Sequence, residues 1–325
     1  MQTQDHDVIQ HCRQWLAAGE RPWLCTIVKT LGSSPRPVGS MLATVNGDMQ
    51  IGSLSGGCVE EDLLAKLREG HYTQQRPQIV EYGVSAEENE RLGLPCGGRL
   101  EILLQQLSAG DCEWLDAVAL AIEQRRCVER VVDLDSGSTT LDPAPHFNTL
   151  SLQQGTLRQC FGPRMRMLLV GAGQLAHSLS ELALAMDYEV MVTDPREQWL
   201  AQWEGPQLEL IQGMPDDIIR TRAADNHSII ITLTHDPRID DMALMEALTT
   251  DAWYVGALGS ERTTAKRLLR LQQLGISEAQ LARLHAPVGI DIGSKTPIEI
   301  SVSIMAELTR LRRREAKLQA LGEQP

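Results

Sequence analysis

The sequence lacks several features that would place the chain in a specialised class of protein. No apolar run approaches the roughly 18 residues that a membrane-spanning helix needs. The N-terminal stretch MQTQDHDVIQHCRQW lacks the basic-then-apolar order of a secretory signal. We therefore expect a cytoplasmic protein with no membrane segment.

The chain also lacks an excess of positive charge. Lys and Arg number 30 against 43 Asp and Glu, so the formal net charge is -13 at pH 7. Sequence-independent nucleic-acid binding depends on clustered Lys and Arg, so the charge argues against a nucleic-acid partner. It does not argue against binding one small anion, because oriented backbone amides can do that locally.

Cysteine is present, but in no pattern that marks a disulfide framework or a zinc site. The 7 cysteines are odd in number, and no CxxC occurs. Most are therefore expected to be reduced thiols in the core or on the surface. Cys58 and Cys96 differ from the others because each adjoins a Gly-Gly pair.

Cys58 ends the glycine-rich stretch GSLSGGC and begins CVEEDLLAKL, which has the pattern of a helix. A thiol in the first helical turn lies near free amides and the positive end of the helix dipole, which favour the thiolate. The acidic Glu60 and Glu61 suit the helix start but oppose the thiolate. The pattern suits a reactive sulfur held beside an anion, and a soft thiolate suits molybdenum or a persulfide sulfur. For both Cys58 and Cys96 the alternative is a small buried hydrophobe beside a tight turn.

The two halves of the 325-residue chain differ in the rhythm of their expected elements. Strands, a hairpin at Asn46-Gly47 and helices predict an α/β domain over residues 1–135. The irregular, proline-containing residues 136–164 predict a linker. Over residues 165–325, strands and helices alternate with short connections, which predicts a Rossmann-like, doubly wound parallel sheet.

The segment VGAGQLA fits the GxGxxA pattern between a strand and a helix. Gly171 permits the tight turn, Gly173 lets a phosphate approach the backbone, and the helix N-terminus favours an anion. Asp194 closes the next strand, where a ribose-binding carboxylate would lie. The segment therefore predicts a dinucleotide-binding unit. Alternatives are a turn for another nucleotide-like ligand and a turn that binds nothing.

Three further side chains have two interpretations each. His235 follows a strand end and could hydrogen-bond a ligand or move a proton, or it is solvated while Asp236 caps the next helix. Arg36, between two prolines, could bind a phosphate with both arms of its guanidinium, or it lies in a plain loop. Arg196 could pair with a phosphate, or it is an exposed structural arginine.

Ordered motifs in both halves resemble those of the XdhC/CoxI family, accessory proteins for molybdenum hydroxylases such as xanthine dehydrogenase. In the first half the motifs are GSSPRPVGSML, IGSLSGGCVEEDL and GLPCGGRLEILL. In the second half they are VGAGQLA, THDPRIDD, YVGALGS and PVGIDIGSKTPIEISVSIMAEL. The resemblance implies a homodimeric chaperone that binds molybdenum cofactor, protects it during sulfuration and inserts it into an apo molybdenum hydroxylase. A cysteine desulfurase partner would supply the sulfur. The resemblance implies a chaperone more than an enzyme.

The candidate residues for reaction chemistry are Cys58, Cys96 and His235, with Cys58 also a candidate molybdenum contact. The candidate cofactor-binding residues are Arg36, Ser55, Gly56, Gly57, Gly97, Gly98, Gly171, Gly173, Gln174, Asp194, Gly259 and Ser260.

Two hypotheses from other classes stay open. The first is an NAD(P)-dependent oxidoreductase, in which the GAGQLA loop and Asp194 bind the nucleotide and His235 is the acid–base group. A dehydrogenase, however, does not require the two Gly-Gly-cysteine motifs. The second is a nucleotide-sensing regulatory protein, although the sequence shows no DNA-binding element.

Overall fold

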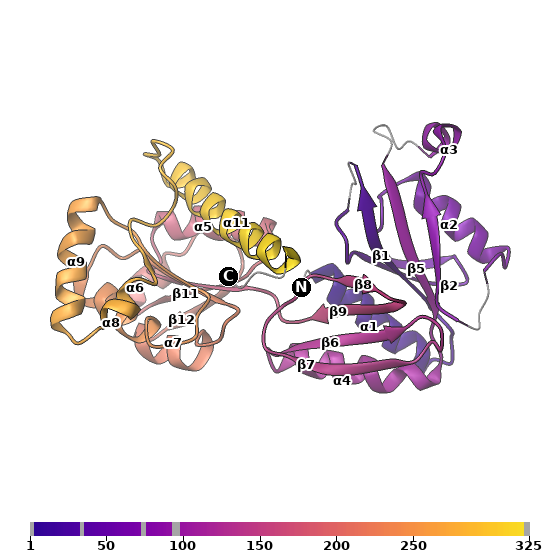
Figure 1. Ribbon diagram of the computed structural model, residues 1–325. Coiled ribbons are helices and arrows are strands. Elements are labelled where there is room, and N and C mark those ends of the chain that lie inside the picture. Colours follow the sequence, from indigo (N-terminus) through magenta and orange to yellow (C-terminus); the bar gives the residue numbers. More distant parts are fainter. Residues whose placement is uncertain (1–2, 33–35, 73–75, 93–97, 322–325) are drawn as a thin grey trace. The chain divides into compact units, whose positions relative to one another are not determined.

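The computed structural model describes residues 3–32, 36–72, 76–92 and 98–321 (Figure 1). The chain divides between Pro163 and Arg164 into two compact units, each with hydrophobic clusters of its own. Within the described ranges, no helix is both long and apolar enough to cross a membrane.

The first unit contains a five-stranded antiparallel sheet in the order β3-β2-β1-β5-β4. Its strands are β1 (Trp23–Leu31), β2 (Met41–Val45), β3 (Met49–Gly52), β4 (Gln78–Tyr82) and β5 (Arg99–Gln106). The predicted hairpin joins β2 to β3, with Asn46 at φ 52° and Gly47 at φ 74°. Positive φ at both positions is what the favoured two-residue hairpin turn requires, so this prediction is confirmed.

Helices cover both faces of this sheet. The helices of the unit are α1 (Thr3–Ala17), α2 (Cys58–Arg68), α3 (Ala86–Arg91) and α4 (Cys112–Glu123), with a 3-10 turn at Ala109–Asp111. Leu63 of α2 packs with Cys25 of β1, whereas Val8 of α1 packs with the next strand residue, Leu24. Side chains alternate along a strand, so neighbouring residues of β1 enter cores on opposite faces.

Residues 136–164 are not the linker that the sequence predicted. The strands β6 (Cys127–Asp133), β7 (Thr139–Ala144), β8 (Ser151–Gln153) and β9 (Thr156–Phe161) form an antiparallel sheet in the order β7-β6-β9-β8. Pro143 lies in β7, an edge strand, where a missing backbone N–H is tolerated. The proline that suggested a linker is therefore compatible with a strand.

The buried Arg130 joins this second sheet to the first. Its side chain has no exposed surface, and its guanidinium carbon lies 4.3 Å from the centroid of the Trp114 ring. It donates hydrogen bonds to Gln105 of β5 and, at 3.3 Å, to Gln159 of β9. Burial lowers the pKa of Arg130 to about 10. Because one buried cation contacts both sheets, residues 136–163 belong to the first unit.

The second unit contains a parallel sheet of six strands in the order β12-β11-β10-β13-β14-β15. The strands are β10 (Arg166–Val170), β11 (Glu189–Asp194), β12 (Glu209–Gln212), β13 (Ser228–Thr232), β14 (Tyr254–Ala257) and β15 (Leu284–His285). Counted from β10, this is the 3-2-1-4-5-6 order of dinucleotide-binding folds. The predicted Rossmann-like parallel sheet is confirmed.

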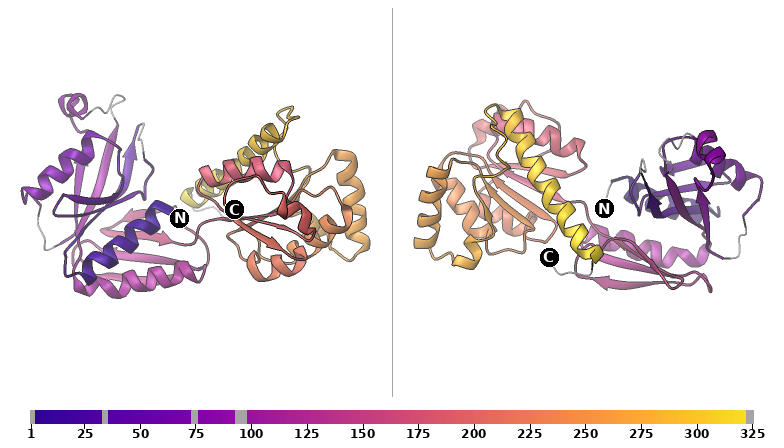
Figure 2. Two further views of the ribbon diagram at one scale, coloured as in Figure 1. Left: turned by 180° about the vertical axis from the view of Figure 1, so that it is seen from behind. Right: turned by 45° about the horizontal axis from the view of Figure 1, so that its top comes forward.

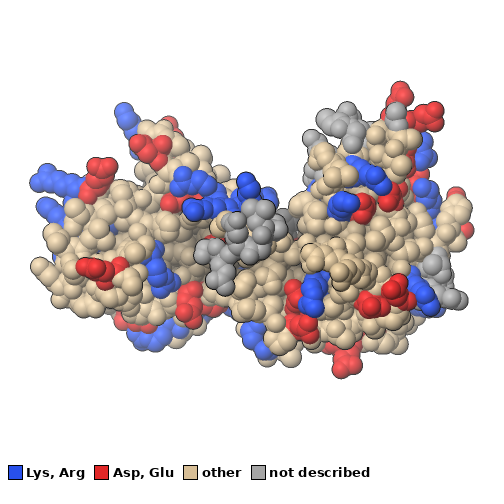
Figure 3. Space-filling view, in the orientation of Figure 1, with Lys and Arg blue, Asp and Glu red and all other residues tan. Residues whose placement is uncertain are grey.

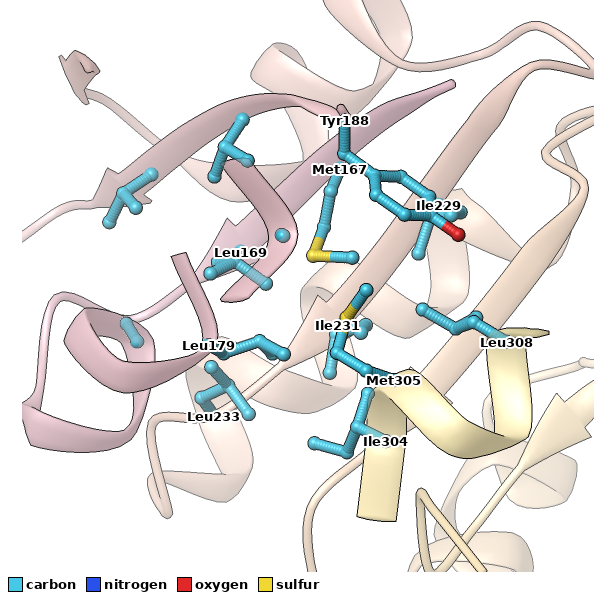
Figure 4. Close-up of a cluster of buried hydrophobic side chains, with 14 of the residues drawn as sticks. Met167, Leu169, Leu179, Tyr188, Ile229, Ile231, Leu233, Ile304, Met305 and Leu308 are labelled. Atoms are coloured by element: carbon cyan, nitrogen blue, oxygen red, sulfur yellow. The ribbon is translucent and has the colours of Figure 1, made fainter. Parts of the chain in front are cut away.

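Helices flank this sheet on both faces (Figures 1 and 2). They are α5 (Gln174–Ala185), α6 (Glu197–Ala201), α7 (Pro215–Arg222), α8 (Pro237–Ala247), α9 (Glu261–Gln273), α10 (Glu278–Leu281) and α11 (Pro297–Leu321). Figure 4 shows one core, in which Met167 and Ile231 of the sheet meet Leu179 of α5 and Met305 of α11. Leu168 and its neighbours on the opposite face pack with α7, α8 and α9.

Burial on both faces explains why the strands of this sheet are continuous apolar runs in the sequence. On the face in view in Figure 3, basic and acidic side chains are interspersed.

Candidate functional site

A cleft of about 820 Å³ lies at the carboxyl ends of the parallel strands in the second unit. Its walls come from the loops that follow β10, β11, β13 and β14, together with the start of α11. The strand order reverses between β10 and β13, and ligands of such sheets bind at this point. The predicted residues that line the cleft are Gly171, Gly173, Gln174, His235, Gly259 and Ser260. The fold therefore brings together residues that lie far apart in the sequence, although their contact with a ligand stays a prediction.

The glycine loop gives the cleft an anion-binding floor. Gly171 has φ +112°, and a Cβ atom there would lie 2.9 Å from Thr234 Cγ2, because the loop passes close to the end of β13. Gly173 is the N-cap of α5, and no described side chain caps that helix. A Cβ atom on Gly173 would meet only Trp199 Cζ3, at 3.9 Å. The N–H groups of the first turn are thus left for a ligand, and they favour negative charge.

Asp194, expected to bind ribose, is fully buried and is not among the residues that line the cleft. Its carboxylate accepts hydrogen bonds from Ala172 N at 3.1 Å and from Arg196 N, Nε and Nη2 at 3.0, 2.8 and 2.8 Å. Burial by itself raises the pKa of Asp194, but the hydrogen bonds and charge of Arg196 outweigh it and hold the pKa below its ordinary value. Arg196, and not Asp194, is the residue that faces the cleft.

His235 lines the cleft from the loop after β13, and its backbone is in the left-handed region, at φ +61°. Thr234 Oγ1 donates to Asp240 at 2.7 Å and accepts from Asp236 N at 3.1 Å, which holds this turn in place. Asp236 caps α8 by accepting from Arg238 N at 3.0 Å. The capping interpretation is therefore confirmed for Asp236, while the exposed His235 side chain still reaches the cleft. A left-handed non-glycine residue costs roughly 1 kcal/mol and is common at ligand sites.

Three cleft residues were not predicted from the sequence: Trp199 of α6 and the adjacent Lys266 and Arg267 of α9. Arg267 is buried and donates to Asp240 at 3.1 Å and to the carbonyl of Leu258 at 3.0 Å. Lys266 is exposed at the cleft and has no ion-pair partner among the described residues. Each of the three lies in the first two turns of a helix that follows a strand end, and this position is the signal that could have identified them.

In the first unit, Cys58 is exposed and is the first residue of α2. Gly57 is the N-cap, and Gly56 has φ +73°. A Cβ atom on either glycine would meet nothing within 4 Å. The predicted position of the thiol, at a helix start after a glycine turn, is confirmed, and its chemistry stays a prediction.

The amides of the loop before Cys58 already bind a carboxylate of the protein. Oε1 of Glu60 accepts hydrogen bonds from Leu54 N at 2.6 Å, Ser55 N at 2.7 Å, Gly56 N at 2.9 Å and Ser53 Oγ at 2.7 Å. Burial by itself raises the pKa of Glu60, but these hydrogen bonds lower it below its ordinary value. The sequence pattern indicated only a place at the helix start for Glu60. The backbone amides of Ser55 and Gly56 are therefore engaged by Glu60.

Glu60→Gln should lower the free energy of unfolding by about 2 kcal/mol at neutral pH, because four donors lose a charged acceptor. The pKa of Glu60 is depressed in the folded state. Its contribution is therefore complete above the unfolded value, roughly 4.3, and is lost as the pH falls through the lower folded value. Urea unfolding at neutral and at acid pH measures the difference, which should shrink in acid.

Glu61→Gln is the matched control for this experiment, since Glu61 is the next residue of the same helix turn and is exposed. It should change stability little at either pH. An equal loss for Glu60→Gln at both pH values would contradict the role of the carboxylate charge.

The remaining predicted residues also belong to the first unit. Cys96 and Gly97 lie outside the described residues. Gly98 is buried, and its carbonyl oxygen lies 2.1 Å from the position of a Cβ atom on Gly83. Arg36 is half-buried, and its contact with a phosphate stays a prediction.

Comparison with known proteins bears on both units. The family model described as the XdhC Rossmann domain matches residues 167–308, which include most of the cleft. The model described as the XdhC and CoxI family matches residues 15–83, which include the Cys58 loop. The chain belongs to the XdhC and CoxI family. The resemblance seen in the ordered motifs is confirmed.

Similar proteins align with nearly the whole chain. A probable xanthine dehydrogenase subunit of Bacillus subtilis (strain 168) is 26% identical over 325 residues, which is 91% of this chain and 95% of the relative. The molybdenum cofactor insertion chaperone PaoD of Escherichia coli (strain K12) is 27% identical over 318 residues, with 95% and 90% covered. A crystal structure of a xanthine dehydrogenase from Bacillus halodurans has a TM-score of 0.74 at 25% identity, with 95% and 97% covered.

Proposed function

We propose that this XdhC-family chain binds molybdenum cofactor and supports its insertion into an apo molybdenum hydroxylase of the xanthine dehydrogenase type. The observation that carries the proposal is the cleft of about 820 Å³, with its glycine loop and open helix N-terminus. Exposed Lys266 and Lys295 add positive charge at its rim. This combination suits a ligand with a phosphate and a bulky ring system, as the pterin of the cofactor has. The similarity to a relative named as a cofactor insertion chaperone supports the same role.

We further propose that Cys58 contacts the molybdenum or its sulfur ligand while the cofactor is sulfurated. Its exposed thiol offers a soft ligand, and the open space around Gly56 and Gly57 admits a bulky group. A cysteine desulfurase would be the sulfur source, and the working form would be a cytoplasmic homodimer. Cys96 and its glycines would serve the same ligand.

The alternative, an NAD(P)-dependent oxidoreductase, requires a free acceptor for the ribose hydroxyls. Asp194 is engaged by Arg196 and Ala172, which weighs against dinucleotide binding of the dehydrogenase kind. His235 lines the cleft and would be the acid–base group of that reaction.

The proposal is tested by purifying the protein from cells that make molybdenum cofactor and measuring molybdenum and pterin per chain. We expect about one of each per chain, and much less for Gly173→Val, whose added side chain crowds the phosphate against Trp199. A chain that carries neither, but binds NAD(P) and turns over an alcohol or aldehyde, would contradict the proposal and support the oxidoreductase.

A further inference from the structure

The carboxylate at the end of the second strand of a dinucleotide-binding unit normally accepts hydrogen bonds from the ribose hydroxyls. In this chain the equivalent residue, Asp194, is 0% exposed and accepts four hydrogen bonds of 2.8 to 3.1 Å from Arg196 and Ala172. A carboxylate offers about four lone-pair sites. The protein itself therefore saturates the acceptor that a ribose diol would need.

Arg196 keeps unused donors at the same place. A guanidinium carries about five N–H donors, and Asp194 engages only Nε and one Nη2 hydrogen. The Arg196 side chain is 29% exposed and lines the cleft. Its guanidinium carbon lies 4.9 Å from the centroid of the Trp199 ring, which is itself part of the cleft wall beside Gly173. An arginine oriented by a carboxylate and flanked by an aromatic ring thus stands beside the glycine loop.

We propose that the Arg196–Asp194 pair sets the class of ligand that the cleft accepts. It closes the ribose subsite and replaces it with a site for a phosphomonoester attached to a planar ring. Arg196 contacts the phosphate, because guanidinium donors bind phosphate oxygens in pairs, and Asp194 positions Arg196. Trp199 provides a surface on which the ring stacks. The inference deepens the proposed function and rests on it only for the identity of the ligand, a pterin phosphate.

The test measures the affinity of NAD and of molybdopterin for the wild-type protein and two variants by calorimetry. Arg196→Ala frees the oxygens of Asp194, so NAD affinity should rise at least tenfold while molybdopterin affinity falls at least tenfold. Arg196→Lys keeps the charge but cannot bridge both carboxylate oxygens, so both affinities should move in the same directions by less. A merely structural role of Arg196 would not produce a gain of NAD binding.

The chain supplies a matched control in Arg238. It binds Asp236, two residues before it, through the same three nitrogens at 3.0, 3.1 and 2.8 Å, but its side chain is 90% exposed and does not line this cleft. Arg238→Ala should leave both affinities unchanged. Thermal unfolding of each variant identifies any loss of fold.

The possible outcomes separate the inference from the proposed function. Unchanged NAD affinity in both Arg196 variants would overturn the inference, even if the wild-type protein carries molybdenum cofactor. A gain of NAD binding in the variants, with no molybdopterin binding by the wild type, would support the role of Arg196 and overturn the proposed function. NADP is the third probe, and tighter binding of NADP than of molybdopterin to the wild type would assign the phosphate to a nucleotide and overturn the pterin ligand.

Discussion

Cys58→Ser should reduce the delivery of active, sulfurated cofactor to a partner hydroxylase by about tenfold or more, because a hydroxyl is a poor substitute for a soft sulfur ligand. The fold should survive the change. The side chain is exposed, and surface substitutions of similar size usually cost about 0.5 kcal/mol or less. Activation of the apo-hydroxylase, measured beside urea unfolding of the variant, separates loss of chemistry from loss of fold.

Cys112→Ser is the matched control for this prediction. Cys112 is also the first residue of a helix, α4, but it follows a 3-10 turn and not a glycine loop. It should behave like the wild type in both measurements. Normal activation of the partner by Cys58→Ser would remove the thiol from the mechanism.

Gly171→Ala should lower the free energy of unfolding by about 2 to 5 kcal/mol, the sum of backbone strain and overpacking. At φ +112° an L side chain is strained. The added Cβ would lie 2.9 Å from Thr234 Cγ2 and 3.2 Å from Thr234 N, so the end of β13 must shift. Urea unfolding measures the loss of stability.

Gly173→Ala makes the same chemical change two residues further on and gives a direct comparison. Gly173 has φ -88°, and its added Cβ would meet only Trp199 Cζ3, at 3.9 Å. Its cost should therefore be about 1 kcal/mol or less, mostly from replacement of the glycine N-cap. Similar losses for the two alanine variants would show that the strain at Gly171 does not govern stability.

Much of the fold could be predicted because its elements are long, periodic and bounded by turn residues. The start of α2 at Cys58 and the hairpin at Asn46-Gly47 follow from local chemistry that needs no distant partner. The parallel sheet follows from buried strands that alternate with helices. The strands within residues 136–164 were not predictable, because β8 is only 3 residues long and β7 is an edge strand that contains a proline. They exist because β6 pairs with them and Arg130 is buried between the sheets.

For the candidate site, the sequence by itself determined which groups are present: a glycine loop before a helix, a thiol at a helix start, and carboxylates near each. Only the tertiary structure decided which of these groups are already paired within the protein. Glu60 engages the amides before Cys58, and Arg196 engages Asp194. The sequence pattern is the same whether such a carboxylate faces a ligand or a neighbouring donor. The choice depends on where the loop places the donors, because a carboxylate whose lone pairs are filled by the protein has none left for a ligand.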